Sequence, residues 1–324
     1  YLQHFWTDEH RTCNLVTNSC VNTNWDNDVC NEDMKDGFVL INKESGPTSH
    51  RIVDIMRELL KIRRIGHTGT LDPMAEGLMI ICIGRATKLA NEILNDKKGY
   101  EAKIEFGYET DTLDRLGNIV KIDSFYAKSE DIKREVESLI DMKKQIPPKI
   151  SSIKINGMKA YKKARLNHDF VMPERNIEIY RSNYINFSQN TLQLSLEVSK
   201  GTYIRSIARD LGYSLNSLAT LVYLKRVSIG NHNLSSSLSI NQIEQMVQNN
   251  DFSFIKSVED FFPSYEQINL SEYEYRKYIN GIPIPLQGTG KKKIYFKNKF
   301  LGLGLIKESL LKSYKYKISG WLIS

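Results

Sequence analysis

The sequence has no long apolar run and little cysteine, and each absence excludes a class of protein. No stretch of about 18 or more apolar residues occurs, so no segment is suited to cross a membrane as a helix. Three of the four cysteines lie within residues 1–33, and the rest of the chain holds only Cys82. Such scarcity is typical of a reduced, cytosolic protein rather than one held by disulfides.

The motifs of bound cofactors and metals are also absent. No G-x-G-x-x-G follows an expected strand, and no P-loop lysine pattern occurs. The six histidines are scattered along the chain. Cys13, Cys20 and Cys30 lack the close pairs of a zinc site, although His4 and His10 lie near them. We therefore expect no cofactor and no metal.

Charge is distributed unevenly along the 324 residues. Residues 1–33 carry one basic and six acidic side chains, whereas the remaining chain carries 44 basic and 32 acidic residues, a net charge of +12. A body this basic predicts a polyanionic partner, because phosphate neutralisation dominates nucleic-acid affinity. The acidic leader has the features of neither a secretory signal nor a transit peptide. We expect residues 1–36 to be a poorly structured extension, with Met34 as the native start.

The apolar patterns predict an α+β fold. Residues 38–42 and 100–106 have the pattern of strands, and residues 191–199 alternate most clearly. Residues 202–212 are expected to form a helix with Thr202 as its N-cap. Strands and helices alternate without the regular rhythm of a parallel doubly wound fold. We therefore expect a mixed, mainly antiparallel, curved central sheet with flanking helices.

The composition changes near residues 250–264. From Ser264 onward the chain has eleven basic and four acidic residues, with seven tyrosines among them. Glycine turns between short apolar segments predict a small β-rich domain over residues 264–324, after a main domain over residues 37–255. Basic and aromatic side chains together suit contact with a nucleic-acid backbone and its bases. An ordinary capping domain is the alternative.

The segment from Gly66 to Leu78 places one acidic side chain, Asp72, among small and turn-forming residues. Gly69 can adopt backbone angles denied to other residues, and Pro73 fixes the chain just after the acid. A rigidly presented lone carboxylate suits a nucleophile or an electrostatic stabiliser rather than a proton-sharing pair. Taken alone, an ordinary glycine-rich surface turn explains the segment equally well.

This segment resembles the signature of the TruB family of tRNA pseudouridine synthases, G-H-x-G-x-L-D-P-x-A-x-G-L, at every fixed position. The likeness to the D-K-T-G-T motif of P-type ATPases fails, because Gly66 occupies the position of the reactive aspartate. Further segments resemble the TruB family in order, over about residues 37–230. They are N-K-E-S-G-P-T-S around Lys43, the strand beginning at Tyr100, Q-I-P-P-K-I-S-S-I-K from Gln145, and S-K-G-T-Y-I-R-S from Ser199.

The chain departs from the family pattern at three places. Glu44 stands where the family usually has proline, which bears on the rigidity of that turn. Ile150 replaces an aromatic residue and Ser152 replaces alanine, so the RNA contact in that segment is expected to differ.

The resemblance implies the pseudouridine synthase fold with a PUA-like RNA-binding domain at the C-terminus. It implies a stand-alone enzyme of the bacterial type that isomerises the T-loop uridine of tRNA, position 55, after flipping the nucleotide into a pocket. The implied partner is the T-arm of tRNA, with no membrane, no obligatory protein partner, a monomeric state and a cytoplasmic location. The implied catalytic residues are Asp72, Tyr100 and Arg205, and the implied substrate or RNA contacts are His67, Lys43, Tyr203, Lys154 and Lys200.

The sequence is also compatible with other interpretations. From position alone, Tyr100 is an ordinary strand aromatic and Arg205 could pair only with Asp210. The chain could belong to a guide-dependent RNA pseudouridine synthase, or be a noncatalytic RNA-binding or RNA-folding module of the same fold. The residues do not decide whether Asp72 attacks the anomeric carbon of the sugar or the sixth carbon of uracil.

Overall fold

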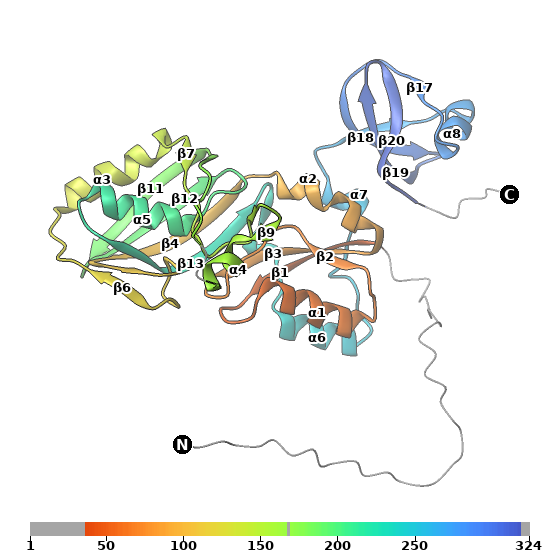
Figure 1. Ribbon diagram of the computed structural model, residues 1–324. Coiled ribbons are helices and arrows are strands. Elements are labelled where there is room, and N and C mark those ends of the chain that lie inside the picture. The colour runs from red at the N-terminus through yellow and green to blue at the C-terminus, as the bar shows by residue number, and fades with distance from the viewer. Residues whose placement is uncertain (1–35, 167–168, 319–324) are drawn as a thin grey trace, which may run out of the picture. The chain divides into compact units, whose positions relative to one another are not determined.

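The central feature of the computed structural model, which describes residues 36–166 and 169–318, is one large sheet (Figure 1). The predicted leader lies outside the described residues except for Asp36. The strands of the sheet are β1 Gly37–Lys43, β2 Ile65–His67, β3 Glu76–Ile83, β4 Lys98–Phe106, β11 Ile179–Ser188, β12 Thr191–Val198, β13 Ala219–Ile229, β14 His232–Asn233 and β15 Lys256–Ser257.

The order of this sheet is β11-β12-β4-β13-β3-β1-β15, with β2 beside β3 and β14 beside β13. The β13–β3 pair is parallel, and the other pairs of strands in this sheet are antiparallel. The predicted mixed, mainly antiparallel sheet is therefore confirmed. Strands β3, β4 and β13 are neighbours near its centre, so residues distant in the sequence meet there.

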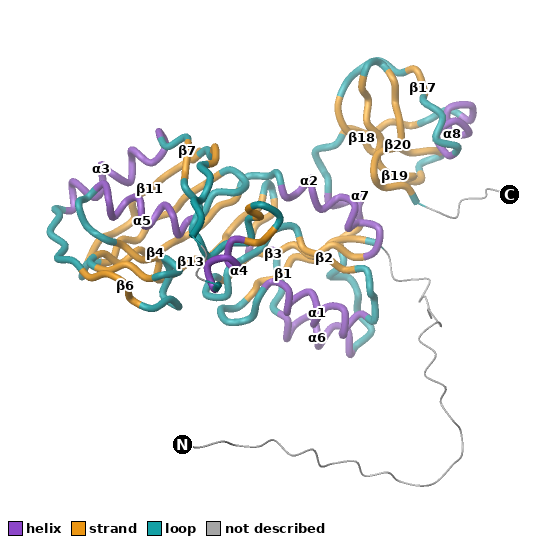
Figure 2. Tube along the Cα trace, viewed as in Figure 1, coloured by secondary structure: helices purple, strands orange, loops and turns teal. Residues whose placement is uncertain are grey.

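Helices flank the sheet, and short strand pairs extend its connections (Figure 2). Helix α5 packs on β13 and β4, α3 on β11, and α1 beside α6. The helices are α1 Ser49–Leu60, α2 Ala90–Leu94, α3 Ser129–Ser138, α4 Ala160–Arg165, α5 Ile204–Ser214, α6 Ile240–Gln248 and α7 Val258–Phe261, with 3-10 turns η1 Gly84–Leu89, η2 Leu139–Asp141 and η3 Leu234–Ser236. The two-stranded pairs are β5 Tyr108–Thr110 with β6 Ile119–Ile122, β7 Lys144–Gln145 with β10 Arg175–Asn176, and β8 Lys154–Ile155 with β9 Met158–Lys159.

The C-terminal residues form a second sheet, ordered β16-β18-β19-β20-β17. Its elements are β16 Glu266–Asn269, α8 Glu272–Ile279, β17 Ile284–Pro285, β18 Gly290–Phe296, β19 Lys299–Lys307 and β20 Leu310–Lys317. The predicted small β-rich, PUA-like fold is present. Within the described residues, no helix is long and apolar enough to span a membrane.

The starts of α1 and α5 are held in different ways. Thr48 caps α1, since its hydroxyl accepts from the Arg51 amide at 3.1 Å. The prediction of Thr202 as the cap of α5 is wrong. The N-cap is Tyr203, which makes no side-chain capping bond, while the Thr202 hydroxyl lies 3.3 Å from Ser199 Oγ. The start of α5 is held instead by a residue far away in the sequence, as described below.

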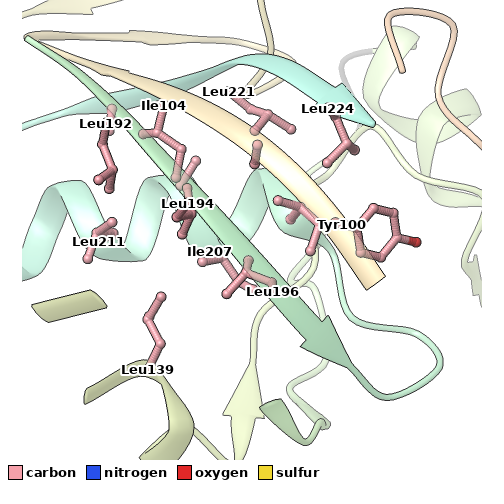
Figure 3. Packing of buried hydrophobic residues seen from close by; sticks show 14 of the residues in the cluster. Tyr100, Ile104, Leu139, Leu192, Leu194, Leu196, Ile207, Leu211, Leu221 and Leu224 are labelled. Atoms are coloured by element: carbon pink, nitrogen blue, oxygen red, sulfur yellow. The ribbon is translucent and has the colours of Figure 1, made fainter. Parts of the chain in front are cut away.

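Apolar and polar residues alternate along β12, and the apolar ones form part of the core beneath the sheet. Leu192, Leu194, Leu196 and Val198 are buried and pack against α5, while the residues between them are half-buried on the other face. Figure 3 shows these leucines facing Ile207 and Leu211 of α5, with Tyr100 at the edge of the cluster. The apolar core therefore fixes both β4 and α5, the elements that carry Tyr100 and Arg205.

Leu194→Ala should destabilise the fold by about 2–5 kcal/mol, because a fully buried side chain is replaced by a cavity. Denaturant unfolding measures the loss. Gln193→Ala, on the other face of β12, is the control and should change stability by less than about 0.5 kcal/mol. Equal losses at the two positions would mean that β12 does not bury the face described here.

Candidate active site

The loop between β2 and β3, residues 68–75, presents Asp72 and is fastened at several points. Gly69 has a φ of +153°, which favours glycine. Ser49 Oγ accepts from the Leu71 amide at 2.8 Å and donates to the Leu71 carbonyl at 3.0 Å. The Ala75 amide donates to the Asp72 carbonyl at 3.0 Å. The loop is thus held by its own turn and by the start of α1, so the carboxylate is rigidly placed.

Asp72 and Arg205 form a two-pronged ion pair. Arg205 Nε donates to Asp72 Oδ2 at 2.9 Å, and Nη2 donates to Oδ1 at 3.2 Å. The Arg205 side chain is 5% exposed, whereas that of Asp72 is 32% exposed. The fork therefore orients the carboxylate from the buried side and leaves its other side open. Arg209, not Arg205, pairs with Asp210.

Arg205 is itself held by groups that the sequence reasoning did not single out. Nη1 donates to the Thr112 carbonyl at 2.8 Å and Nη2 to the Ile150 carbonyl at 3.1 Å. The carboxylate of Asp114 lies 3.8 Å from Nε and is 8% exposed. The sequence does contain a sign of this role for Asp114, which lies at the end of the polar loop 107–114. A buried arginine needs more hydrogen-bond acceptors than one carboxylate supplies, so a second acidic residue near it could have been expected.

Lys43 and Arg226 lie beneath the Asp72 loop. Lys43 is fully buried, and its Nζ donates to the carbonyls of Ala75 at 2.6 Å and Glu44 at 2.9 Å. Burial lowers the pKa of Lys43 to about 8, partly opposed by Asp72. Arg226 Nε donates to the Leu78 carbonyl at 2.7 Å and Nη2 to the Gly69 carbonyl at 3.2 Å. Lys43, predicted to contact substrate, therefore occupies a position that fixes the loop from below.

Two predicted site residues flank the loop. His67 ends β2 and is half-buried, and its Nδ1 accepts from the Gly69 amide at 3.2 Å. Burial, with Arg226, lowers the pKa of His67, which favours the neutral imidazole. Tyr100 is 9% exposed and belongs to the same apolar cluster as Leu71 and Met74 of the loop. Figure 3 shows its hydroxyl directed away from the aliphatic side chains.

The other residues predicted to contact RNA are Tyr203, Lys154 and Lys200. Tyr203 is half-buried beside Arg205, and burial raises its pKa, partly offset by Ser151 and Arg205. Lys154 is exposed on β8. Lys200 is exposed and donates to Asn95 Oδ1 at 2.7 Å. Asp72, Arg205, Tyr100, His67 and Tyr203 thus gather around one loop, whereas Lys154 and Lys200 belong to the surrounding surface.

Comparison with known proteins identifies the family. The profile of the TruB family pseudouridylate synthase, N-terminal domain, matches residues 57–204. A tRNA pseudouridine synthase B of Fusobacterium nucleatum is 40% identical over 286 residues, covering 87% of this chain and 99% of that protein. The chain belongs to the TruB family. It is therefore an enzyme that isomerises uridine to pseudouridine.

Further relatives agree with the TruB assignment, and solved structures share the fold. Proteins named tRNA pseudouridine synthase B from Clostridium kluyveri and Borreliella afzelii are each 37% identical, cover 86% and 88% of this chain, and are themselves covered to 99%. The H/ACA RNP bound to a substrate RNA containing 2'-deoxyuridine aligns with a TM-score of 0.63 at 16% identity, over 87% of this chain and 85% of that one. A Cbf5-Nop10-Gar1 complex aligns with 0.62 at 18%, over 83% and 78%. At these identities the likeness establishes the fold alone.

Proposed function

We propose that this TruB-family enzyme converts the T-loop uridine of tRNA, position 55, to pseudouridine, with Asp72 as the nucleophile. It acts without a guide RNA or an obligatory protein partner. The names of the relatives, tRNA pseudouridine synthase B, support tRNA as the substrate. The observation that carries the catalytic assignment is the fork from buried Arg205 to a carboxylate whose side chain is 32% exposed.

The chemistry requires a rearrangement within one nucleotide. The bond from the sugar's anomeric carbon to N1 of uracil breaks, and a bond from the same carbon to C5 forms. The proton on C5 leaves and N1 gains one, so no atom is gained or lost and no redox step occurs. Asp72 attacks either the anomeric carbon or C6 of uracil, and its ionised form is the nucleophile in both cases. Arg205 keeps that form oriented through two charge-assisted hydrogen bonds.

The residues around the carboxylate supply the other roles. Tyr100 stacks on the uracil and assists loss of the C5 proton. The target nucleotide lies within a folded RNA loop, so it must be flipped out to reach Asp72. His67, at the end of β2, fills the space that the nucleotide leaves. Tyr203 contacts the flipped nucleotide beside Arg205.

A basic hairpin beside the site suits the phosphates of the RNA. The segment 149–165, which contains β8, β9 and α4, has six basic side chains and no acidic one. Tyr161 lies under the cations of Lys159 and Arg165, at 5.8 and 5.6 Å from the ring centre. Such a surface binds a nucleic-acid backbone through phosphate neutralisation. Lys154 of this segment is proposed to contact tRNA. Lys200, which donates to Asn95, is proposed to contact tRNA as well.

The purified protein, alone with an unmodified tRNA transcript, should convert position 55 nearly completely. Chemical mapping of pseudouridine along the transcript measures the product. A transcript with cytidine at position 55 is the control and should give no product, because the site acts on uracil.

Two results would contradict the proposal in different ways. Product that forms only when a guide RNA and partner proteins are added would indicate a guide-dependent enzyme. Tight tRNA binding without any product would indicate a noncatalytic binding or folding module.

A further inference from the structure

The side-chain amide of Gln145 is joined to the backbone of Tyr203 by two hydrogen bonds. Gln145 Oε1 accepts from the Tyr203 amide at 2.9 Å, and Nε2 donates to the Tyr203 carbonyl at 3.1 Å. Gln145 is 3% exposed and its backbone pairs with Arg175 between β7 and β10. The side-chain amide can bond the N–H and the C=O of one residue because it carries an acceptor oxygen and a donor nitrogen side by side.

This amide pair holds the backbone at the residue that begins α5. Tyr203 is the N-cap of α5 and makes no side-chain capping bond. The Tyr203 carbonyl also accepts from the Ser206 and Ile207 amides of the first turn, so the same carbonyl joins Gln145 to the helix. Gln145, which makes these bonds, lies 58 residues away from Tyr203 in the sequence. Arg205 follows two residues later, so a rotation at Tyr203 moves the guanidinium directly.

The residues after Gln145 continue along the same helix. The Ile146 carbonyl accepts from Ser206 Oγ at 2.9 Å and from Arg209 Nη2 at 3.0 Å. Two buried prolines, Pro147 and Pro148, follow and fix the backbone dihedral φ. The chain then reaches Ile150, whose carbonyl accepts from Arg205 Nη2 at 3.1 Å. The segment 145–150 is therefore fastened both to the start of α5 and to the arginine itself.

We propose that Gln145 is a positioning residue for the reaction, because its amide fixes the backbone at Tyr203 and so sets the direction from which Arg205 meets Asp72. This inference rests on the proposed roles of Asp72 and Arg205. It also assigns a role to the Q-x-P-P segment, whose carbonyls complete the set of acceptors around α5. Gln145 need not touch the substrate.

Gln145→Met removes both hydrogen bonds and keeps a similar side-chain volume. The single-turnover rate of pseudouridine formation should fall about 10- to 100-fold, since small displacements of reacting groups are costly. The affinity for tRNA should be unchanged. In an Arg205→Lys background the same substitution should cost much less, because residues that act through one another are not additive. A merely structural role would lower Tm and leave the two rate losses multiplicative.

Gln145→Glu tests the donor alone. A carboxylate oxygen would face the Tyr203 carbonyl, whereas a protonated carboxyl restores the donor, and burial raises the pKa of such a group. The rate relative to the natural chain should therefore recover as the pH falls from about 8 to about 5.5. Gln245→Glu, at an exposed position of α6, is the matched control and should show no such recovery.

The outcomes separate this inference from the proposed function. A full rate in Gln145→Met beside an impaired Arg205→Lys would overturn the positioning role and leave the function intact. A full rate in both variants would overturn the site itself. If Gln145→Met unfolds, the pH recovery of Gln145→Glu decides, and its absence in a folded, impaired variant would overturn the proposal.

Discussion

Asp72→Asn should fold, bind tRNA as the natural chain does, and form no detectable pseudouridine. The amide has the shape of the carboxylate but is not a nucleophile, so a loss of roughly 10⁵-fold or more is expected. Release of tritium from the C5 position of labelled uridine measures turnover, because that proton must leave when the new carbon–carbon bond is made. Filter binding of tRNA measures affinity on the same preparation.

The control for this substitution is Asp111→Asn, which changes an exposed carboxylate in the neighbouring loop. Asp111 Oδ1 accepts from the Asn118 amide at 3.0 Å, an acceptor role that an asparagine oxygen can also fill. Its rate should stay close to that of the natural chain. Similar losses in the two variants would point to general damage to the fold rather than to a nucleophile at position 72.

Arg205→Lys should lower the single-turnover rate by about 100- to 1,000-fold while tRNA binding is kept. Lysine retains the charge, but one ammonium cannot reproduce a planar fork that reaches both Asp72 oxygens and the carbonyls of Thr112 and Ile150. The carboxylate would therefore be held less firmly. Rapid-quench kinetics with enzyme in excess separates this loss from changes in binding or product release.

Arg134→Lys is the matched control for the arginine fork. Arg134 lies on α3, pairs with Asp131 and has a side chain that is 76% exposed, so the exchange should leave the rate unchanged. An undiminished rate in Arg205→Lys would make Arg205 a structural residue and remove the main support for the oriented carboxylate.

Much of the fold could be predicted from local patterns. The alternation of β12 gives its buried face directly, and the turn before α1 contains its cap, Thr48. Local pattern failed at α5, where Thr202 has the chemistry of a cap but lies outside the helix. The residue that begins α5 is bonded to Gln145, and no local rule relates residues 58 positions apart.

Some residues of the candidate site could likewise be predicted from the sequence, and others could not. The turn chemistry of its loop made Asp72 a candidate, but only the resemblance to the TruB signature distinguished that loop from an ordinary surface turn, and the same resemblance pointed to Arg205 and Tyr100. Asp114 and Arg226 were missed because each owes its place to sheet pairing and burial rather than to neighbours in the sequence. For Lys43 the motif led to a predicted substrate contact. Only the fold shows that its ammonium group donates to a carbonyl of the Asp72 loop from beneath.

The central claim is that an ionised carboxylate at position 72, oriented by Arg205, performs the attack. The most direct test is the single-turnover rate of Asp72→Glu against that of Asp72→Asn, each with enzyme in excess over tRNA. Glutamate keeps the nucleophile and misplaces it by one methylene, so its rate should be low but measurable, whereas the asparagine variant should give no product above background. A rate for Asp72→Asn equal to or greater than that for Asp72→Glu would contradict the claim.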